Sequence, residues 1–233
     1  MSFGARALIR LGALEHNLDV IRQAAPDSKV MAVIKANAYG HGMLPVAQHL
    51  SHVDAFAVAR VTEAIELREH GVKSRIILLA GVMNTVELVT ATQYGFEPVV
   101  HCAEQLDLLD SCQEGAVDAW LKFDTGMNRL GFDPADAGAL IERLRRSPGI
   151  NALRLMTHLA SADELGEETT VRQLEVFRAV AEGFDGDVSI ANTPATLGWP
   201  AIANARDEFG FTGDSWIRPG IALFGISPFG DRT

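Results

Sequence analysis

Short apolar runs rich in β-branched residues alternate along the chain with stretches whose apolar residues recur at spacings of three and four. The first pattern predicts buried strands and the second predicts amphipathic helices. The strand candidates are Val30–Ile34, Ala55–Val58, Ile76–Leu79, Glu97–Val100, Ala119–Phe123, Leu153–Thr157, Val188–Ile190 and Ile221–Phe224. The helix candidates are Leu14–Ala24, Thr62–His70, Thr85–Gln93, Ala103–Ser111, Ala135–Arg145 and Thr170–Ala181.

This alternation predicts an α/β fold, and eight strand–helix units within 233 residues match a (β/α)8 TIM-type barrel with parallel strands. A doubly wound open sheet is the alternative, because periodicity does not show closure. We assign residues 12–233 to the barrel. The segment Ala5–Leu11 has no place among the eight strands, so residues 1–11 are predicted to form an extra N-terminal strand that pairs elsewhere.

Composition narrows the class of partner and the compartment. The chain has 30 acidic and 20 basic residues, a formal net charge of −10 and no run of like charge, which argues against binding nucleic acid or an anionic membrane. The longest apolar run, Ile76–Met83, is too short to span a bilayer, and the start of the chain lacks the pattern of a secretion signal. Cys102 and Cys112 form no metal-binding motif, so we expect no metal, free thiols and a cytoplasmic location.

Candidate chemistry lies just after the apolar runs, because barrel enzymes carry their sites at the carboxyl ends of the strands. The polar residues found there, expected to converge on one mouth, are Lys35, Tyr39, Lys122, Asp124, Arg129, His158, Asn192, Thr193 and Arg218.

Each of these residues also has a simple structural interpretation. A lysine at a strand end can reach solvent, Asn192 and Thr193 can cap a short helix, and Arg218 can pair with a surface carboxylate. The combination points further. An amine with cationic neighbours suits a Schiff base, and Thr193 with the backbone amides around Gly220 suits a phosphate. Together they suggest pyridoxal phosphate.

Four motifs, AVIKANAYGHG, KFDTGMNRLGF, THLASAD and WIRPGIALFGISP, occur in this order and together resemble the amino-terminal barrel of alanine racemase over essentially the whole chain. The resemblance implies a pyridoxal-phosphate-dependent isomerase that interconverts L- and D-alanine and supplies D-alanine for the peptidoglycan of the cell wall. It also implies that the full-length enzyme is a homodimer.

The resemblance further implies a role for each residue at the mouth. Lys35 would hold the cofactor as a Schiff base and act as a catalytic base on one face of the substrate. The phosphate would be held by Tyr39, Thr193, Gly220 and Ile221, with Asn192 close by. The remaining contacts would come from Arg129 on the phenolic oxygen, His158 against the ring and Arg218 at the pyridine nitrogen.

The last of these roles has a physical consequence. Arginine stays protonated and offers only donors, so a ring nitrogen facing Arg218 must accept a hydrogen bond and remain unprotonated. The ring then withdraws electrons less strongly than a pyridinium, which favours return of the proton over transamination.

Two interpretations of Lys122 stand side by side. Many members of the family carry a carbamylated lysine at this position, which would convert an ammonium into an anion able to orient Arg129. Alternation places Lys122 and Asp124 on one strand face, so a plain contact between them is the other interpretation.

The sequence departs from the family in one respect that bears on activity. Racemisation needs a base on each face of the α-carbon, and the family takes its second base from a tyrosine in a β-rich domain of the partner subunit. This sequence ends before such a domain, with which residues 1–11 would pair. Its two tyrosines are Tyr39, assigned to the phosphate, and Tyr94, predicted at a helix end on the opposite rim. We therefore expect this chain by itself to bind the cofactor but to racemise weakly or not at all.

Two other functional classes share the lysine and the phosphate site. The length of the chain is close to that of the single-domain, non-catalytic carriers of pyridoxal phosphate, although those carriers lack the motifs KANAYGHG and DTGMNRLGF. A serine or broad-specificity racemase and an amino-acid decarboxylase are further alternatives. The decarboxylases typically place a carboxylate, not an arginine, at the pyridine nitrogen.

Overall fold

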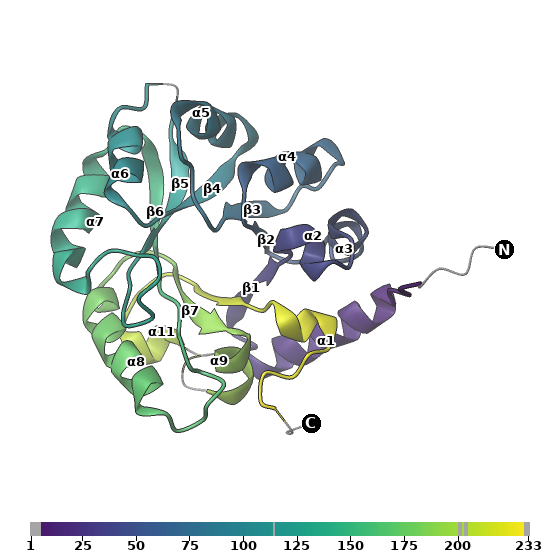
Figure 1. The fold of residues 1–233 in the computed structure, drawn as a ribbon. Coiled ribbons are helices and arrows are strands. Elements are labelled where there is room, and N and C mark those ends of the chain that lie inside the picture. Colours follow the sequence, from purple (N-terminus) through teal and green to yellow (C-terminus); the bar gives the residue numbers. More distant parts are fainter. Residues whose placement is uncertain (1–5, 114, 200–201, 203–204, 231–233) are drawn as a thin grey trace.

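The computed structural model describes residues 6–113, 115–199, 202 and 205–230 and consists of a closed barrel of parallel strands surrounded by helices (Figure 1). The strands follow one another around the barrel in chain order, and β8 closes it by pairing with β1. Their bounds are β1 Ser28–Val33, β2 Ala55–Val58, β3 Arg75–Leu78, β4 Phe96–Val100, β5 Val117–Lys122, β6 Ile150–Met156, β7 Val188–Asn192 and β8 Ser215–Arg218. The predicted barrel is confirmed and the open sheet is excluded.

The helices lie outside the strands (Figure 1). Their bounds are α1 Leu11–Ala24, α2 Lys35–Tyr39, α3 Met43–His49, α4 Val61–Glu69, α5 Thr85–Tyr94, α6 Ala103–Asp110, α7 Ala137–Arg146, α8 Glu168–Ala181, α9 Thr193–Gly198 and α11 Ala205–Phe209, with 3₁₀ turns η1 Pro134–Asp136 and η2 Ile221–Phe224. Within the part of the chain that the structure describes, no helix has the length and apolar character needed to cross a bilayer.

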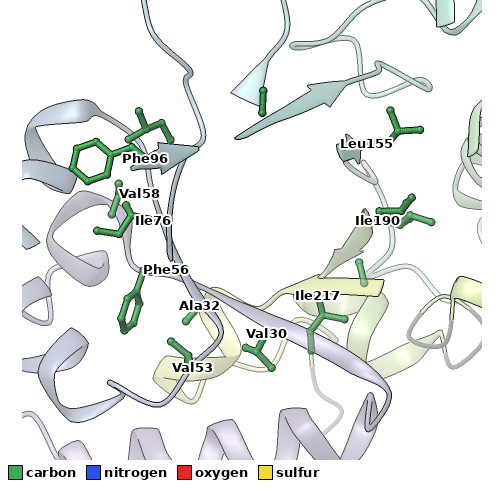
Figure 2. Packing of buried hydrophobic residues seen from close by; sticks show 14 of the residues in the cluster. Val30, Ala32, Val53, Phe56, Val58, Ile76, Phe96, Leu155, Ile190 and Ile217 are labelled. Atoms are coloured by element: carbon green, nitrogen blue, oxygen red, sulfur yellow. The ribbon is translucent and has the colours of Figure 1, made fainter. Parts of the chain in front are cut away.

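Alternation along the strands separates two layers of core. In β1, Val30 and Ala32 belong to the large cluster between the barrel and its helices, whereas Met31 and Val33 belong to a smaller cluster inside the barrel. Figure 2 shows members of the outer layer, among them Val30 and Ala32, arranged around the barrel wall. Because strands covered on both faces need apolar residues at every position, they read as continuous apolar runs in the sequence.

One predicted strand is wrong. Residues 221–224 form the 3₁₀ turn η2, and the eighth strand is instead Ser215–Arg218, which pairs with both β7 and β1. A run of four apolar residues does not distinguish a strand from a helical turn. Pro219 has no N–H for the ladder, and the backbone then leaves the extended region at Gly220, where φ is −120° and ψ is −86°. Arg218 therefore ends the eighth strand rather than preceding it.

The predicted N-terminal strand falls partly outside the described residues. Residues 6–10 belong to no helix or strand, and α1 begins at Leu11, three residues earlier than the predicted Leu14. The pairing of residues 1–11 with another domain stays a prediction.

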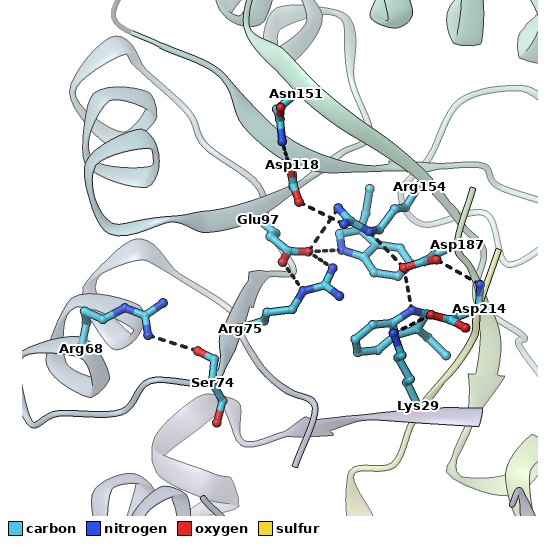
Figure 3. Close-up of polar contacts among 12 residues, drawn as sticks. Lys29, Arg68, Ser74, Arg75, Glu97, Asp118, Asn151, Arg154, Asp187 and Asp214 are labelled. Carbon is cyan, nitrogen blue, oxygen red and sulfur yellow. Dashed lines mark hydrogen bonds and ion pairs between the residues drawn. The ribbon is translucent and has the colours of Figure 1, made fainter. Parts of the chain in front are cut away.

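A network of charged and aromatic side chains fills the amino-terminal end of the barrel (Figure 3). The Arg75 guanidinium donates to both carboxylate oxygens of Glu97, at 2.5 and 2.8 Å, and the Trp120 indole also donates to Glu97, at 2.9 Å. Arg154 pairs with Asp118 and Asp187, with N–O distances of 3.0 and 3.2 Å. We call this network the barrel floor, and it lies at the end of the barrel opposite the expected site.

Candidate functional site

A cavity of about 360 Å³ lies at the carboxyl ends of the strands. All ten residues predicted to bind or orient the cofactor line it, namely Lys35, Tyr39, Lys122, Arg129, His158, Asn192, Thr193, Arg218, Gly220 and Ile221. We call this cavity the mouth pocket. The sequence analysis missed apolar residues that also line it, including Ala59, Leu79 and Ala80, which follow β2 and β3. Their position just after the apolar runs was the available signal, but an apolar side chain at a strand end does not by itself indicate a binding site.

Lys35 and Tyr39 are the two ends of α2, a turn of unusual handedness. The φ angles of Ala36, Asn37, Ala38 and Tyr39 lie between 52° and 54°, so four successive residues other than glycine are left-handed. That conformation costs roughly 1–2 kcal/mol per residue for L-amino acids. Local hydrogen bonds offset part of the cost, including one from the Met43 N–H to the Asn37 side chain at 2.8 Å.

Tyr39, Thr193, Gly220 and Ile221 form one wall of the mouth pocket, which we call the anion cradle. The Gly220 N–H donates to the Thr193 hydroxyl at 2.9 Å. A Cβ atom on Gly220 would lie 2.7 Å from the Tyr39 phenol oxygen, so only glycine allows the phenol this close to the backbone. Burial raises the pKa of the Tyr39 phenol above its ordinary value, so the phenol stays a neutral donor at physiological pH.

Arg218 reaches the mouth pocket from the end of β8 and is held by neutral acceptors. Its guanidinium donates to the Ser189 hydroxyl and to the backbone carbonyls of Thr157 and Ile190, the latter two at 2.6 and 3.2 Å. Among the ion pairs of the described residues, none includes Arg218. Burial lowers the pKa of Arg218 to about 9, which still leaves it a cation at neutral pH.

Arg129 stands on a loop organised by Asp124. The Asp124 carboxylate accepts hydrogen bonds from the backbone N–H groups of Gly126, Asn128 and Arg129, at 3.0, 3.0 and 2.9 Å. Lys122 does not pair with Asp124 here but donates to the Leu130 carbonyl of the same loop at 2.8 Å. Among the described residues no ion pair joins Lys122 to Asp124, although the Asp124 charge still acts to raise the pKa of Lys122.

Lys122 and His158 both have lowered pKa values. Burial, with a contribution from the charge of Arg218, lowers the pKa of the Lys122 amine to about 8. Burial and the neighbouring cations lower the pKa of His158 to about 2, so its ring is neutral at physiological pH. Gln173 of α8 fixes the backbone at His158 by donating to its carbonyl at 3.1 Å.

Asn192 has the capping role that the sequence allowed. Its side-chain oxygen accepts from the Ala195 N–H at 3.2 Å at the start of α9, and its amide donates to the Leu159 carbonyl at 3.2 Å. Asn192 therefore joins the ends of two strands at the edge of the mouth pocket, close to the anion cradle.

The charges in the mouth pocket have one sign. Lys35, Lys122, Arg129 and Arg218 line it, and no aspartate or glutamate is among the described residues that do. Nor does any cluster of three or more His, Cys, Asp or Glu side chains within the described ranges offer a metal site. An acidic protein that keeps cations together in a cleft has a site suited to an anionic ligand.

Comparisons with known proteins identify the family of the chain. Residues 9–228 match the family model described as alanine racemase, N-terminal domain. The alanine racemase of Vibrio parahaemolyticus is 43% identical over 231 residues, which are 98% of this chain and 62% of that protein. The alanine racemase of Shewanella piezotolerans is 44% identical over 229 residues, covering 97% of this chain and 61% of that protein.

A solved structure gives the same result. The biosynthetic alanine racemase of Pseudomonas aeruginosa superimposes with a TM-score of 0.86 at 39% identity, covering 96% of this chain and 60% of that one. The chain thus spans about three fifths of the length of these relatives. On the family match, the identity of its relatives and the shared barrel, the chain belongs to the alanine racemase family, whose N-terminal domain it matches.

Proposed function

We propose that this chain is the cofactor-binding part of a cytoplasmic alanine racemase, which holds pyridoxal phosphate through Lys35 and interconverts L- and D-alanine for peptidoglycan precursors. The observation that carries the proposal is the mouth pocket itself. It places an amine and an anion cradle in one cavity that is rich in cations and lacks carboxylates among its described lining residues.

The residues present fit the cofactor. The anion cradle offers the Tyr39 phenol and the Thr193 hydroxyl as donors for a phosphate. The Thr193 oxygen accepts from the Gly220 N–H, which leaves the hydroxyl proton to donate into the pocket. Arg218 offers donors and no acceptor, so it suits an unprotonated ring nitrogen and would exclude a pyridinium. Arg129 would donate to the phenolic oxygen, and the neutral ring of His158 would pack against the cofactor.

When bound, pyridoxal phosphate supplies an electron sink for the α-carbon of an amino acid. The Lys35 amine would hold the cofactor covalently and move the α-proton on one face of the substrate. Arg218 would keep the sink weak and so favour return of the proton. The second base is proposed to come from the partner subunit of a homodimer, because Tyr94 lies at the end of α5 and does not line the mouth pocket.

Lys122 is proposed to carry a carbamate. A pKa of about 8 leaves a substantial neutral fraction of the amine at physiological pH, and the neutral amine is the form that adds to carbon dioxide with loss of a proton. The resulting anion would pair with Arg129, which lines the same pocket.

Reductive trapping tests the cofactor site. Purified chain is mixed with pyridoxal phosphate, reduced with borohydride and mapped by peptide mass spectrometry, with Lys35→Ala as the control. We expect a phosphopyridoxyl group on Lys35 and none in the control. An adduct spread over the exposed lysines, or no adduct, contradicts the proposal.

Substrate identity needs a separate measurement. The trapped site is shared by racemases, decarboxylases and non-catalytic carriers, so the loaded chain is incubated in D2O with both enantiomers of alanine and, separately, of serine, because Lys35 would exchange the α-proton on one face only. Deuterium at the α-carbon of alanine supports the racemase. Loss of carbon dioxide would instead favour a decarboxylase, and no reaction with either amino acid would favour a carrier.

A further inference from the structure

Glu63, in the first turn of α4, makes more contacts than a helix cap requires. Its Oε2 atom accepts from the backbone N–H groups of Ala59 and Arg60, at 2.8 and 3.2 Å, which satisfies the start of its own helix. Its Oε1 atom accepts from the N–H of Ala36 at 2.7 Å. Ala36 is the first left-handed residue of α2 and directly follows Lys35.

We propose that Glu63 is a positioning residue for Lys35 and Tyr39. Its carboxylate fixes the first peptide of the left-handed turn and thereby directs the lysine amine and the phenol into the mouth pocket. The inference rests on the proposed function, because it concerns the groups assigned there to the cofactor.

The turn depends on this contact because little else ties its backbone to the neighbouring unit. The N–H of Ala38 donates to the Ile34 carbonyl, and those of Gly40 and Gly42 donate within the same segment. Among the hydrogen bonds given for the described residues, the bond to Glu63 is the only one that joins the backbone of residues 36–39 to another strand–helix unit. Without the Glu63 carboxylate, the Ala36 N–H has no charged acceptor at the residue where the backbone becomes left-handed.

The next strand–helix unit provides an internal comparison. Glu87 occupies the same third position of α5 that Glu63 occupies in α4, and its Oε2 atom accepts from the Met83 N–H at 2.8 Å. Among the described residues, that bond is the only hydrogen bond that the Glu87 carboxylate accepts. Capping alone therefore occupies one carboxylate oxygen in both units, and the use of the second oxygen is particular to Glu63.

The test compares Glu63→Gln with the matched control Glu87→Gln in the full chain. A glutamine side chain has one acceptor oxygen, so at position 63 it serves the helix start or Ala36 but not both. Three quantities are measured: the unfolding temperature, hydrogen exchange of the peptide that spans Lys35–Gly42 without ligand, and the yield of borohydride-trapped pyridoxal phosphate on Lys35.

We expect Glu63→Gln to lose at least as much stability as Glu87→Gln, because both remove the charge from a helix cap and only the first also loses a hydrogen bond. Only Glu63→Gln should speed exchange in the turn and lower the yield on Lys35 at limiting pyridoxal phosphate, by about five-fold or more for one lost hydrogen bond to a charged group. Glu63→Asp keeps the charge but has a side chain shorter by one methylene, so it should also speed exchange in the turn and lower the yield on Lys35. This variant replaces Glu63→Gln in the test if Glu63→Gln does not fold.

Equal exchange and equal yield in the variants at positions 63 and 87 would overturn the inference. If the unmodified chain gives no adduct on Lys35, the proposed function fails instead. Hydrogen exchange, which needs no cofactor, still decides whether Glu63 holds the turn.

Discussion

The left-handed turn at Lys35–Tyr39 allows a sharp test of its conformation through Ala36→Gly. Ala36 is exposed and has a φ of 53°, so removing its methyl group loses no core packing. The substitution relieves a left-handed penalty of about 1–2 kcal/mol. Against this, the freer unfolded chain of a glycine variant disfavours folding by about 0.5–1 kcal/mol. The net expectation is a change between zero and about 1.5 kcal/mol in favour of the folded state.

The matched control is Ala179→Gly. Ala179 is also exposed but lies in the right-handed helix α8, where the same substitution destabilises by about 1 kcal/mol. The two variants should therefore differ by about 1–2.5 kcal/mol in the free energy of unfolding, or by roughly 2–10 °C in the midpoint for a domain of this size.

Urea unfolding followed by circular dichroism, together with thermal scans, gives both values. Equal destabilisation of the two variants would refute the reasoning, because it would mean that residue 36 has no left-handed penalty to relieve. If Ala36→Gly is more stable but gives a lower yield of trapped cofactor, the strained left-handed conformation lowers the stability of the fold and at the same time orients Lys35.

Three other predictions concern the anion cradle and the barrel floor. Gly220→Ala puts a methyl group 2.7 Å from the phenol oxygen of the cradle. It should weaken binding of pyridoxal phosphate by about ten-fold or more in an absorbance titration. The control Gly138→Ala, whose added methyl group would have no heavy atom within 4 Å, should leave binding unchanged. Arg75→Met removes two charged hydrogen bonds from its buried carboxylate partner Glu97, which keeps the Trp120 indole and a longer contact, at 3.7 Å, with the Arg154 guanidinium. It should destabilise by about 2–3 kcal/mol in urea, whereas Arg146→Met, in an exposed pair, should stay within about 0.5 kcal/mol. Burial acts to raise the pKa of Asp187, but hydrogen bonds and the charge of a neighbouring arginine lower it below its ordinary value of 3.8. The ionised carboxylate therefore stabilises the fold above pH 3.8, and this stabilisation is lost at lower pH. The difference in unfolding free energy between the unmodified chain and Asp187→Asn should narrow as the pH falls below 3.8, and a difference independent of pH would contradict this.

The sequence predicted the barrel because its strands are apolar on both faces and alternate with amphipathic helices. The eighth strand was missed because its apolar run is only two residues long, Trp216 and Ile217, between Ser215 and Arg218, whereas the four apolar residues 221–224 resemble a strand. Periodicity reports burial, and a buried helical turn has the same signature as a short strand.

The residues that line the site could be predicted from the sequence, but the residues that hold them in place could not. Residues that touch the cavity could be found, because parallel strands bring their carboxyl ends to one rim. Glu63 could not be found, because a glutamate near a helix start has an adequate explanation as a cap and nothing in the sequence records its second partner, Ala36. The left-handed turn was equally hidden, since its four left-handed residues are two alanines, an asparagine and a tyrosine and include no glycine.

The charges of the mouth pocket affect how a ligand arrives as well as how it is held. A phosphate-bearing molecule approaching this chain, whose formal net charge is −10, first meets long-range repulsion and feels the cations only near the cleft. Dissolved ions screen exposed charges over about 10 Å at 0.1 M salt but screen buried groups such as Arg218 much less. Added salt should therefore remove more of the repulsion than of the attraction. Capture of the cofactor is expected to hold its rate or to quicken as ionic strength rises, which is the reverse of the behaviour of a protein with an exposed basic patch.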